Sequence, residues 1–116
     1  MPGLPRINLR LFAKTDELTV ANELLREIVS MGEQFGEVHA QPLERYWKIP
    51  EYHEVGIEFH PVGEAMIAYE CVLTALASGW ERHGSLEEPC AVWNPSAEGT
   101  SLSPLVMWMS LDLVTI

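Results

Sequence analysis

The stretch Arg6-Ile7-Asn8-Leu9-Arg10-Leu11-Phe12 alternates polar and apolar side chains along its length. Successive side chains of a β-strand point to opposite faces of a sheet, so this pattern predicts a half-buried strand with Ile7, Leu9 and Leu11 facing the core. The other face of the sheet either needs a covering layer or is partly open to solvent. A helical layer is expected on the apolar face.

A helical pattern follows this strand. Apolar residues recur at spacings of three and four over residues 16–34, with charged residues on the opposite side. Thr15 or Asp16 is placed to cap the N-terminus, and Gly36 lies where a helix commonly stops. We expect this amphipathic helix to pack its apolar side on the sheet.

A second helical pattern covers residues 64–83, with His83 in its last turn and Gly84 just after it. Nearly all of its side chains are apolar, which indicates a helix that is buried on more than one side or packs against another chain. Cys71 lies within it, and Cys90 opens a later apolar strand. Both cysteines are predicted to be small buried residues, and nothing in the sequence requires a disulfide.

The remaining apolar segments predict four more strands. Residues 38–49 and 55–59 are expected to form a hairpin or bent edge that Pro50 interrupts. Residues 90–93 form a short strand, and the alternation over 105–113 predicts a long final strand that pairs back onto it.

The resulting order β-α-β-β-α-β-β predicts one α+β domain over residues 1–116. We expect a ferredoxin-like sandwich, in which two helices cover one face of an antiparallel sheet. Residues 96–103 are predicted to form a loop. Phe12, Trp93 and Trp108 are apolar side chains available to the second sheet face, which makes that face a candidate contact surface.

The chain is acidic, and the excess of acid is uneven. Its 116 residues include 7 Lys and Arg against 17 Asp and Glu, which gives a net charge of −10. Residues 1–50 carry −1, whereas residues 51–116 carry −9 because Arg82 is their single base. Nucleic-acid binding requires clustered Lys and Arg, so we expect none. The acidity agrees either with solubility or with the attraction of a basic protein partner.

The sequence also predicts a cytoplasmic protein that does not enter membranes. No apolar run approaches the roughly 20 residues of a membrane span. The first residues, Met1-Pro2-Gly3-Leu4-Pro5-Arg6, lack the apolar region of a signal peptide.

No motif typical of an enzyme is present. The chain has no GxSxG, no glycine-rich phosphate loop and no HExxH, so we expect no catalysis and no cofactor. Glu54, Glu58 and His60 share one face of a predicted strand, with His53 on the other. This is more typical of a solvated strand than of a metal site, and no metal is predicted. A small metal-dependent enzyme or ligand-binding domain that uses Glu58 and His60 stays as an alternative.

The segment from Glu44 to Glu54 combines three aromatic residues with three acids. Tyr, Trp and Arg dominate the hot spots of protein interfaces, so the segment is interpreted either as a binding surface or as a hairpin that closes the core. In the second case Trp47 is in the core. The predicted partner-binding residues are acidic or aromatic: Glu44, Tyr46, Glu51, Tyr52, Glu54, Glu58, Glu87 and Glu88.

The closing strands Val92-Trp93-Asn94-Pro95 and Val106-Met107-Trp108-Met109-Ser110-Leu111-Asp112-Leu113 complete a small acidic domain. In this the chain resembles the immunity proteins of bacterial polymorphic-toxin and contact-dependent inhibition systems. The resemblance implies a non-enzymatic protein that binds a cognate toxin domain and blocks its active site. It implies no particular site residues. The acidity agrees with it, because nuclease toxins are basic and attract an acidic inhibitor.

The apolar second helix leaves a third alternative open, in which the chain is a structural module that forms a homodimer through that helix.

Overall fold

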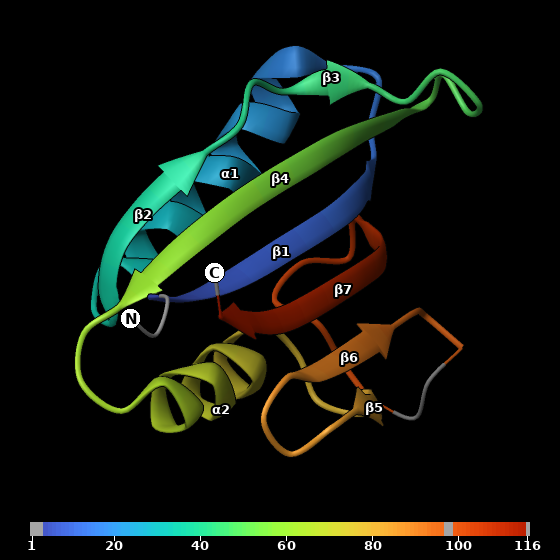
Figure 1. The fold of residues 1–116 in the computed structure, drawn as a ribbon. Helices are drawn as coiled ribbons and strands as arrows, with labels where there is room; N and C mark the ends of the chain where they lie inside the picture. The colour runs from blue at the N-terminus through green and yellow to red at the C-terminus, as the bar shows by residue number, and fades with distance from the viewer. Residues whose placement is uncertain (1–3, 97–98, 116) are drawn as a thin grey trace.

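Strand β1 (Pro5–Lys14) is the centre of the fold and has an antiparallel neighbour on each side (Figure 1). The computed structural model describes residues 4–96 and 99–115. In it, β4 (Tyr52–Pro61) pairs with one edge of β1 and β7 (Val106–Thr115) with the other. The full strand order is β2-β4-β1-β7-β6-β5, and the short β3 also pairs with β4. The described chain is therefore α+β, with two helices and an open antiparallel sheet of seven strands.

The alternation predicted in the first strand is confirmed, because Ile7, Leu9 and Leu11 are buried. Leu9 lies opposite Ile57 of β4 and Leu111 of β7, so the three central strands present their buried side chains on the same face. A slip of one residue in this register would turn the apolar set of a strand to the other face. The register therefore commits one face of the sheet to the core.

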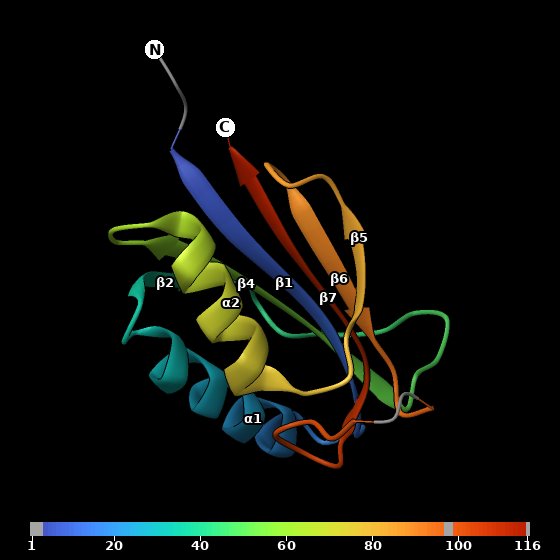
Figure 2. The ribbon, with the colours of Figure 1, turned by 90° about the horizontal axis from the view of Figure 1, so that it is seen from below.

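Both helices cover that apolar face (Figure 2). Helix α1 (Leu18–Gly32) and helix α2 (Ala65–Leu76) each bury one side against the sheet. Tyr69 joins α2 to β7, because its buried hydroxyl donates a hydrogen bond of 2.7 Å to the carbonyl of Leu111. Burial also raises the pKa of Tyr69, which stays a neutral donor. Among the described residues, no helix has the length and hydropathy that a membrane span requires.

The first helix is shorter than the predicted 16–34, and its expected caps are wrong. Glu17 is the residue before the helix, and its side chain makes no capping hydrogen bond. Thr15 acts one turn earlier, where its hydroxyl accepts from the N–H of Glu17 at 3.1 Å. Gly36 does not end the helix but opens the next strand, with φ at +149°.

The strand predicted over 38–49 is divided into β2 (Gly36–Ala40) and β3 (Glu44–Arg45), which both pair with β4. Pro42 lies in the break, where its missing N–H removes a donor from the strand ladder. The predicted hairpin is present, and its turn at residues 46–51 leads directly into β4.

Helix α2 ends at Leu76, so the prediction of a helix that continues to residue 83 is wrong. The indole N–H of Trp80 lies 3.0 Å from the carbonyls of both Leu73 and Ala77 and donates to this pair. The carbonyl of Leu73 also accepts from the N–H of Ala77 at 3.1 Å, so the indole adds a second donor to the last turn and engages the carbonyl of Ala77 just beyond it. Gly79, with φ at +84°, turns the chain away in a conformation that favours glycine.

The residues beyond this turn form β5 (Glu81–Gly84), a strand that the helical pattern did not predict. It pairs with β6 (Pro89–Trp93) at the edge of the sheet. His83 therefore lies on a strand and not in a helix terminus. Gly84, with φ at +81°, begins the turn to β6. The extra strand and the divided hairpin explain why the sheet has seven strands where five were expected.

The strands predicted over 90–93 and 105–113 are confirmed as β6 and β7, which pair with Cys90 opposite Asp112. Of the loop predicted over 96–103, residues 97 and 98 lie outside the described residues. Ser101 forms an isolated β-bridge with Ala77 at the end of α2.

Gly32 tests how tightly α1 packs on the sheet. A Cβ at this position would overlap the ring of Phe59, which is buried on β4. Helix propensity alone favours alanine over glycine by up to about 1 kcal/mol, whereas overpacking a core costs about 1–3 kcal/mol. We therefore expect Gly32→Ala to lower the free energy of unfolding in urea. Ser30→Ala, an exposed change on the same helix, is the control, and a Gly32→Ala variant as stable as the wild type would contradict this packing.

Candidate functional site

The sheet face opposite the helices, here called the open face, has no covering layer among the described residues (Figure 2). Its central side chains are polar or aromatic and are partly buried or, for Arg10, exposed. They include Arg6, Asn8, Arg10 and Phe12 from β1 and Glu54, Glu58 and His60 from β4. The shared face predicted for Glu54, Glu58 and His60 is thus present. His53 points to the other side, where its ring is buried and Nδ1 donates to the carbonyl of Thr15 at 2.8 Å.

Two arginines of β1 are paired with the two glutamates of β4 on the open face. Arg10 contacts Oε1 of Glu54 through Nη2 at 2.6 Å and Nε at 2.7 Å. Arg6 Nε lies 2.9 Å from Oε1 of Glu58. Partly exposed pairs of this kind contribute about 0.2–1 kcal/mol each to stability. Their larger effect is on the surface charge, because each of these carboxylates already has a cation beside it.

Four aromatic side chains gather at one end of the open face, where β1, β7 and the 46–51 turn meet. We call Phe12, Tyr46, Trp47 and Trp108 the aromatic cluster. The ring centroid of Phe12 lies 4.5 Å from that of Tyr46 and 5.4 Å from that of Trp108. Tyr46 and Trp47 are 6.4 Å apart in an edge-on arrangement. The guanidinium of Arg10 lies 5.1 Å from the centre of the Phe12 ring, so a cation–π contact joins the cluster to the charged pairs.

Trp47 is the most exposed member of this cluster, so the interpretation of the 44–54 segment that placed Trp47 in the core is wrong. Its side chain is 79% exposed, whereas Tyr46 and Tyr52 are half-buried. The reason is the turn, because Trp47 lies beyond the last pairing of β3 with β4 and has no strand opposite it. Lys48 Nζ lies 5.2 Å from the centre of its ring. A large aromatic side chain held in water in this way is typical of a contact surface.

A shallow hollow of about 310 Å³ lies beside the aromatic cluster. The break between β2 and β3 and the absence of a side chain at Gly56 create this space. Its charged walls are Arg10, Glu44 and Glu54. Glu44 and Glu54 lie directly opposite each other in the strand pairing, where like charges repel. Arg10 reduces this repulsion because it contacts Glu54.

The predicted partner-binding residues do not form a single surface. Glu44, Tyr46, Glu51, Tyr52 and Glu54 come from β3, the 46–51 turn and the start of β4, close to the aromatic cluster. Glu58 lies further along β4. Glu87 and Glu88 are exposed in the turn between β5 and β6, at the opposite edge of the sheet, where Oε2 of Glu88 accepts from the N–H of Thr115 at 3.4 Å.

Phe12, Trp47 and Trp108 were not among the predicted partner-binding residues, and three other side chains lie elsewhere than expected. Trp93 was expected on the open face, but it is buried on the helical side, where its indole N–H donates to the carbonyl of Ser78 at 2.9 Å. Phe12 and Trp108 do lie on the open face, as predicted. Cys71 is exposed on α2 and Cys90 is partly exposed, so neither is the buried residue that was expected.

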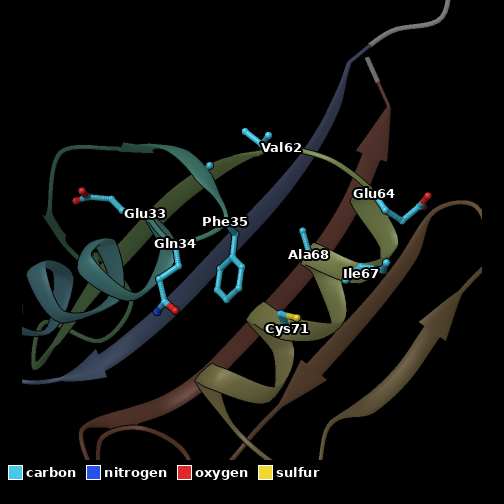
Figure 3. Close-up of a pocket in the computed structure, with 9 residues that line it drawn as sticks. Glu33, Gln34, Phe35, Val62, Glu64, Ile67, Ala68 and Cys71 are labelled. Atoms are coloured by element: carbon cyan, nitrogen blue, oxygen red, sulfur yellow. The ribbon is translucent and has the colours of Figure 1, made fainter.

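A groove of about 420 Å³ lies elsewhere, between the end of α1 and the start of α2 (Figure 3). Phe35, Val62 and Ile67 give it an apolar lining, and Glu33 and Glu64 lie at its sides. The groove continues along α2 past Cys71, over a side of the helix that is apolar and exposed. The second helix is therefore not buried on more than one side, as the sequence allowed, and its packing against another chain stays a prediction.

Comparison with protein-family models, with curated proteins and with solved structures finds no match to this chain.

Asp112 provides a test of the electrostatics of the open face. It lies on β7 between Asn8 of β1 and Cys90 of β6, and burial raises the pKa of its carboxyl. An acid whose folded pKa lies above its unfolded value favours the unfolded state once it is ionised, and this loss disappears as pH falls to the unfolded pKa.

We therefore expect Asp112→Asn to raise the free energy of unfolding at pH 7.5 and the gain to shrink as pH falls toward about 4. Chemical denaturation across this pH range measures it. Glu87→Gln, which removes an equally negative but exposed side chain, is the control. A loss of stability in Asp112→Asn at pH 7.5 would contradict the expectation, since it would mean that the carboxylate makes a favourable contact.

Proposed function

We propose that this chain is an immunity-type inhibitor, a protein that neutralises a basic toxin domain by binding it and performs no chemistry itself. The observation that carries the proposal is the aromatic cluster, with Trp47 79% exposed beside acidic side chains at one end of the open face. The resemblance of the closing strands to immunity proteins supports the same function.

The aromatic cluster has the composition of an interface hot spot. Tyr and Trp provide large contact areas with few rotatable bonds, and Arg is enriched with them at the centres of interfaces. Phe12 packs against Tyr46 from the sheet side and is itself backed by Trp108, which holds the Tyr46 ring in place before any partner arrives. A surface already ordered in the free protein loses less entropy on binding.

Charge favours a basic partner, and the contacts divide the acids into two groups. Glu54 and Glu58 have arginines beside them, so they add little to the attraction. Glu44 and Glu51 are exposed and have no ion pair among the described residues. We assign to Glu44 and Glu51 the attraction of a basic surface and to Tyr46 and Trp47 the close contact.

For the fold, we propose that β1, α1, β2, β4, α2 and β7 form a ferredoxin-like core to which β5 and β6 are added at one edge. The order β2-β4-β1-β7 and the antiparallel pairing throughout support this assignment. In this arrangement the added strands widen the open face without covering it.

Self-association through α2 is a second candidate. The exposed apolar side chains beside the groove, Val62 and Ile67, favour it. Sedimentation of the purified chain over a range of concentrations distinguishes the two functions, because the inhibitor is expected to stay monomeric until its partner is added.

Trp47→Ala tests the aromatic contact. The side chain is largely exposed, so we expect the free energy of unfolding to change little. Binding of the partner captured from the cytosol of the source organism should weaken about 30-fold or more, as for a hot-spot residue. Leu86→Ala, which removes a side chain that is 92% exposed in the turn before β6, is the matched control. Equal weakening by both variants, or by neither, would contradict a contact at Trp47.

A charge-reversed pair, Glu44→Lys with Glu51→Lys, tests the attraction. We expect slower association with the partner, by about tenfold or more at low salt, and a smaller difference at high salt. Glu23→Lys with Glu27→Lys makes the same change in net charge on exposed positions of α1 and should have a much weaker effect. Stopped-flow or surface-binding kinetics at two salt concentrations measures both. Equal slowing by the two pairs would show that only net charge matters and would contradict the placement of the site.

A further inference from the structure

A group of three potential metal ligands lies on the open face at the edge formed by β2 and β4. Glu37, His39 and His60 each have a ligand atom within 4.8 Å of the others, and they are the one group of this kind among the described residues. The rings of His39 and His60 lie close together, with centroids 4.4 Å apart. The group is separate from the aromatic cluster, which lies beyond the far end of β2.

The strand register explains this gathering. Glu37 of β2 lies opposite His60 of β4, and His39 lies opposite Glu58. Because residues two apart share a strand face, all four side chains project from the open face as two neighbouring cross-strand pairs. The sequence signals are thus two Glu-x-His motifs, at 37–39 and at 58–60. The antiparallel pairing of β2 with β4 places them side by side.

The carboxylates of the group have different surroundings. Oε1 of Glu58 accepts from Arg6 at 2.9 Å and contacts Nε2 of His60 at 3.0 Å, so it is already engaged. Oε1 of Glu37 contacts only Nε2 of His39, at 2.7 Å, and its side chain is 70% exposed. Glu37 is therefore the carboxylate that is available to an ion. An ion bound through Nε2 of His39 and His60 would replace the contacts of these atoms with Glu37 and Glu58.

We propose that Glu37, His39 and His60 bind a divalent transition-metal ion such as Zn²⁺. Two imidazoles and one carboxylate form a donor set typical of zinc, with water as a fourth ligand, whereas Mg²⁺ and Ca²⁺ prefer oxygen ligands alone.

The geometry requires only small movements. Bonds of about 2.1 Å in a tetrahedral site place neighbouring ligand atoms about 3.4 Å apart. The contact between Glu37 and His39 would open by about 0.7 Å to reach that spacing. The other ligand atoms already lie within 4.8 Å of one another. Glu37 and His39 are exposed enough for their side chains to rotate without moving the strands.

This site is independent of the proposed inhibitor function, so its test uses the full chain alone. After treatment with a chelator that is then removed, ZnCl₂ is titrated into the protein at pH 7.5 in a calorimeter. We expect one zinc ion per chain, a higher melting temperature with zinc, and no binding of MgCl₂ under the same conditions.

His39→Ala and His60→Ala should each weaken zinc binding by about tenfold or more while leaving the melting temperature without metal nearly unchanged. The chain provides a close control at its opposite edge. His83 and Glu81 have the same Glu-x-His spacing and the same side-chain exposure as His39 and Glu37, 49% and 70%, but no second histidine faces them. His83→Ala should therefore leave zinc binding unchanged.

Three results would overturn the proposal: no zinc binding by the wild type, affinity that neither His39→Ala nor His60→Ala lowers, or an equal loss in His83→Ala. Co²⁺ in place of Zn²⁺ gives a second measurement, because a four-coordinate cobalt site absorbs visible light strongly. We expect that absorption in the wild type and in His83→Ala, and its loss in His60→Ala.

Discussion

The antiparallel pairing of β1 on both of its edges is the constraint on which the rest of the structure depends. It aligns Leu9 with Ile57 on one side and with Leu111 on the other, so three strands share one apolar face. Both helices are needed to cover that face, and none of the described chain is left to cover the other. The open face is therefore a direct consequence of the register, and every polar residue that alternates with the core on β1 and β4 belongs to it.

The open face combines neutralised and unpaired charge in a definite arrangement. Arg6 and Arg10, from the centre of the sheet, engage Glu58 and Glu54. Asp112 on β7 is a further acid within the sheet, whereas the exposed Glu44 and Glu51 lie at one end, on either side of Tyr46 and Trp47 in the chain. The arginines and glutamates at the centre of the face are paired, whereas one end carries unpaired acids and aromatic side chains. This arrangement favours a directional contact with a basic protein at that end over diffuse attraction to any cation. The histidines at the β2 edge add a group with different chemistry to the same face.

Local alternation in the sequence was sufficient to predict β1 and β7, because period-two patterns report directly on which side chains are buried. The extent of α2 could not be predicted in this way. Its apolar pattern continues past Leu76, whereas the chain turns at Gly79 and the indole of Trp80 contacts the carbonyls of Leu73 and Ala77, contacts that depend on the three-dimensional path. The place of Trp47 was left open for a related reason. Composition indicates that an aromatic residue makes contacts, but only the pairing of β3 with β4 shows that Trp47 lies in the turn beyond it.

The most direct test of the binding surface is amide hydrogen exchange of the chain, free and in complex with its captured partner, read by mass spectrometry. A surface at the acidic, aromatic end of the open face predicts new protection over residues 44–54, with no change on α2 or in the 85–88 turn. Protection confined to α2 and the groove beside it would contradict that surface and would assign the contact to the helical side of the molecule.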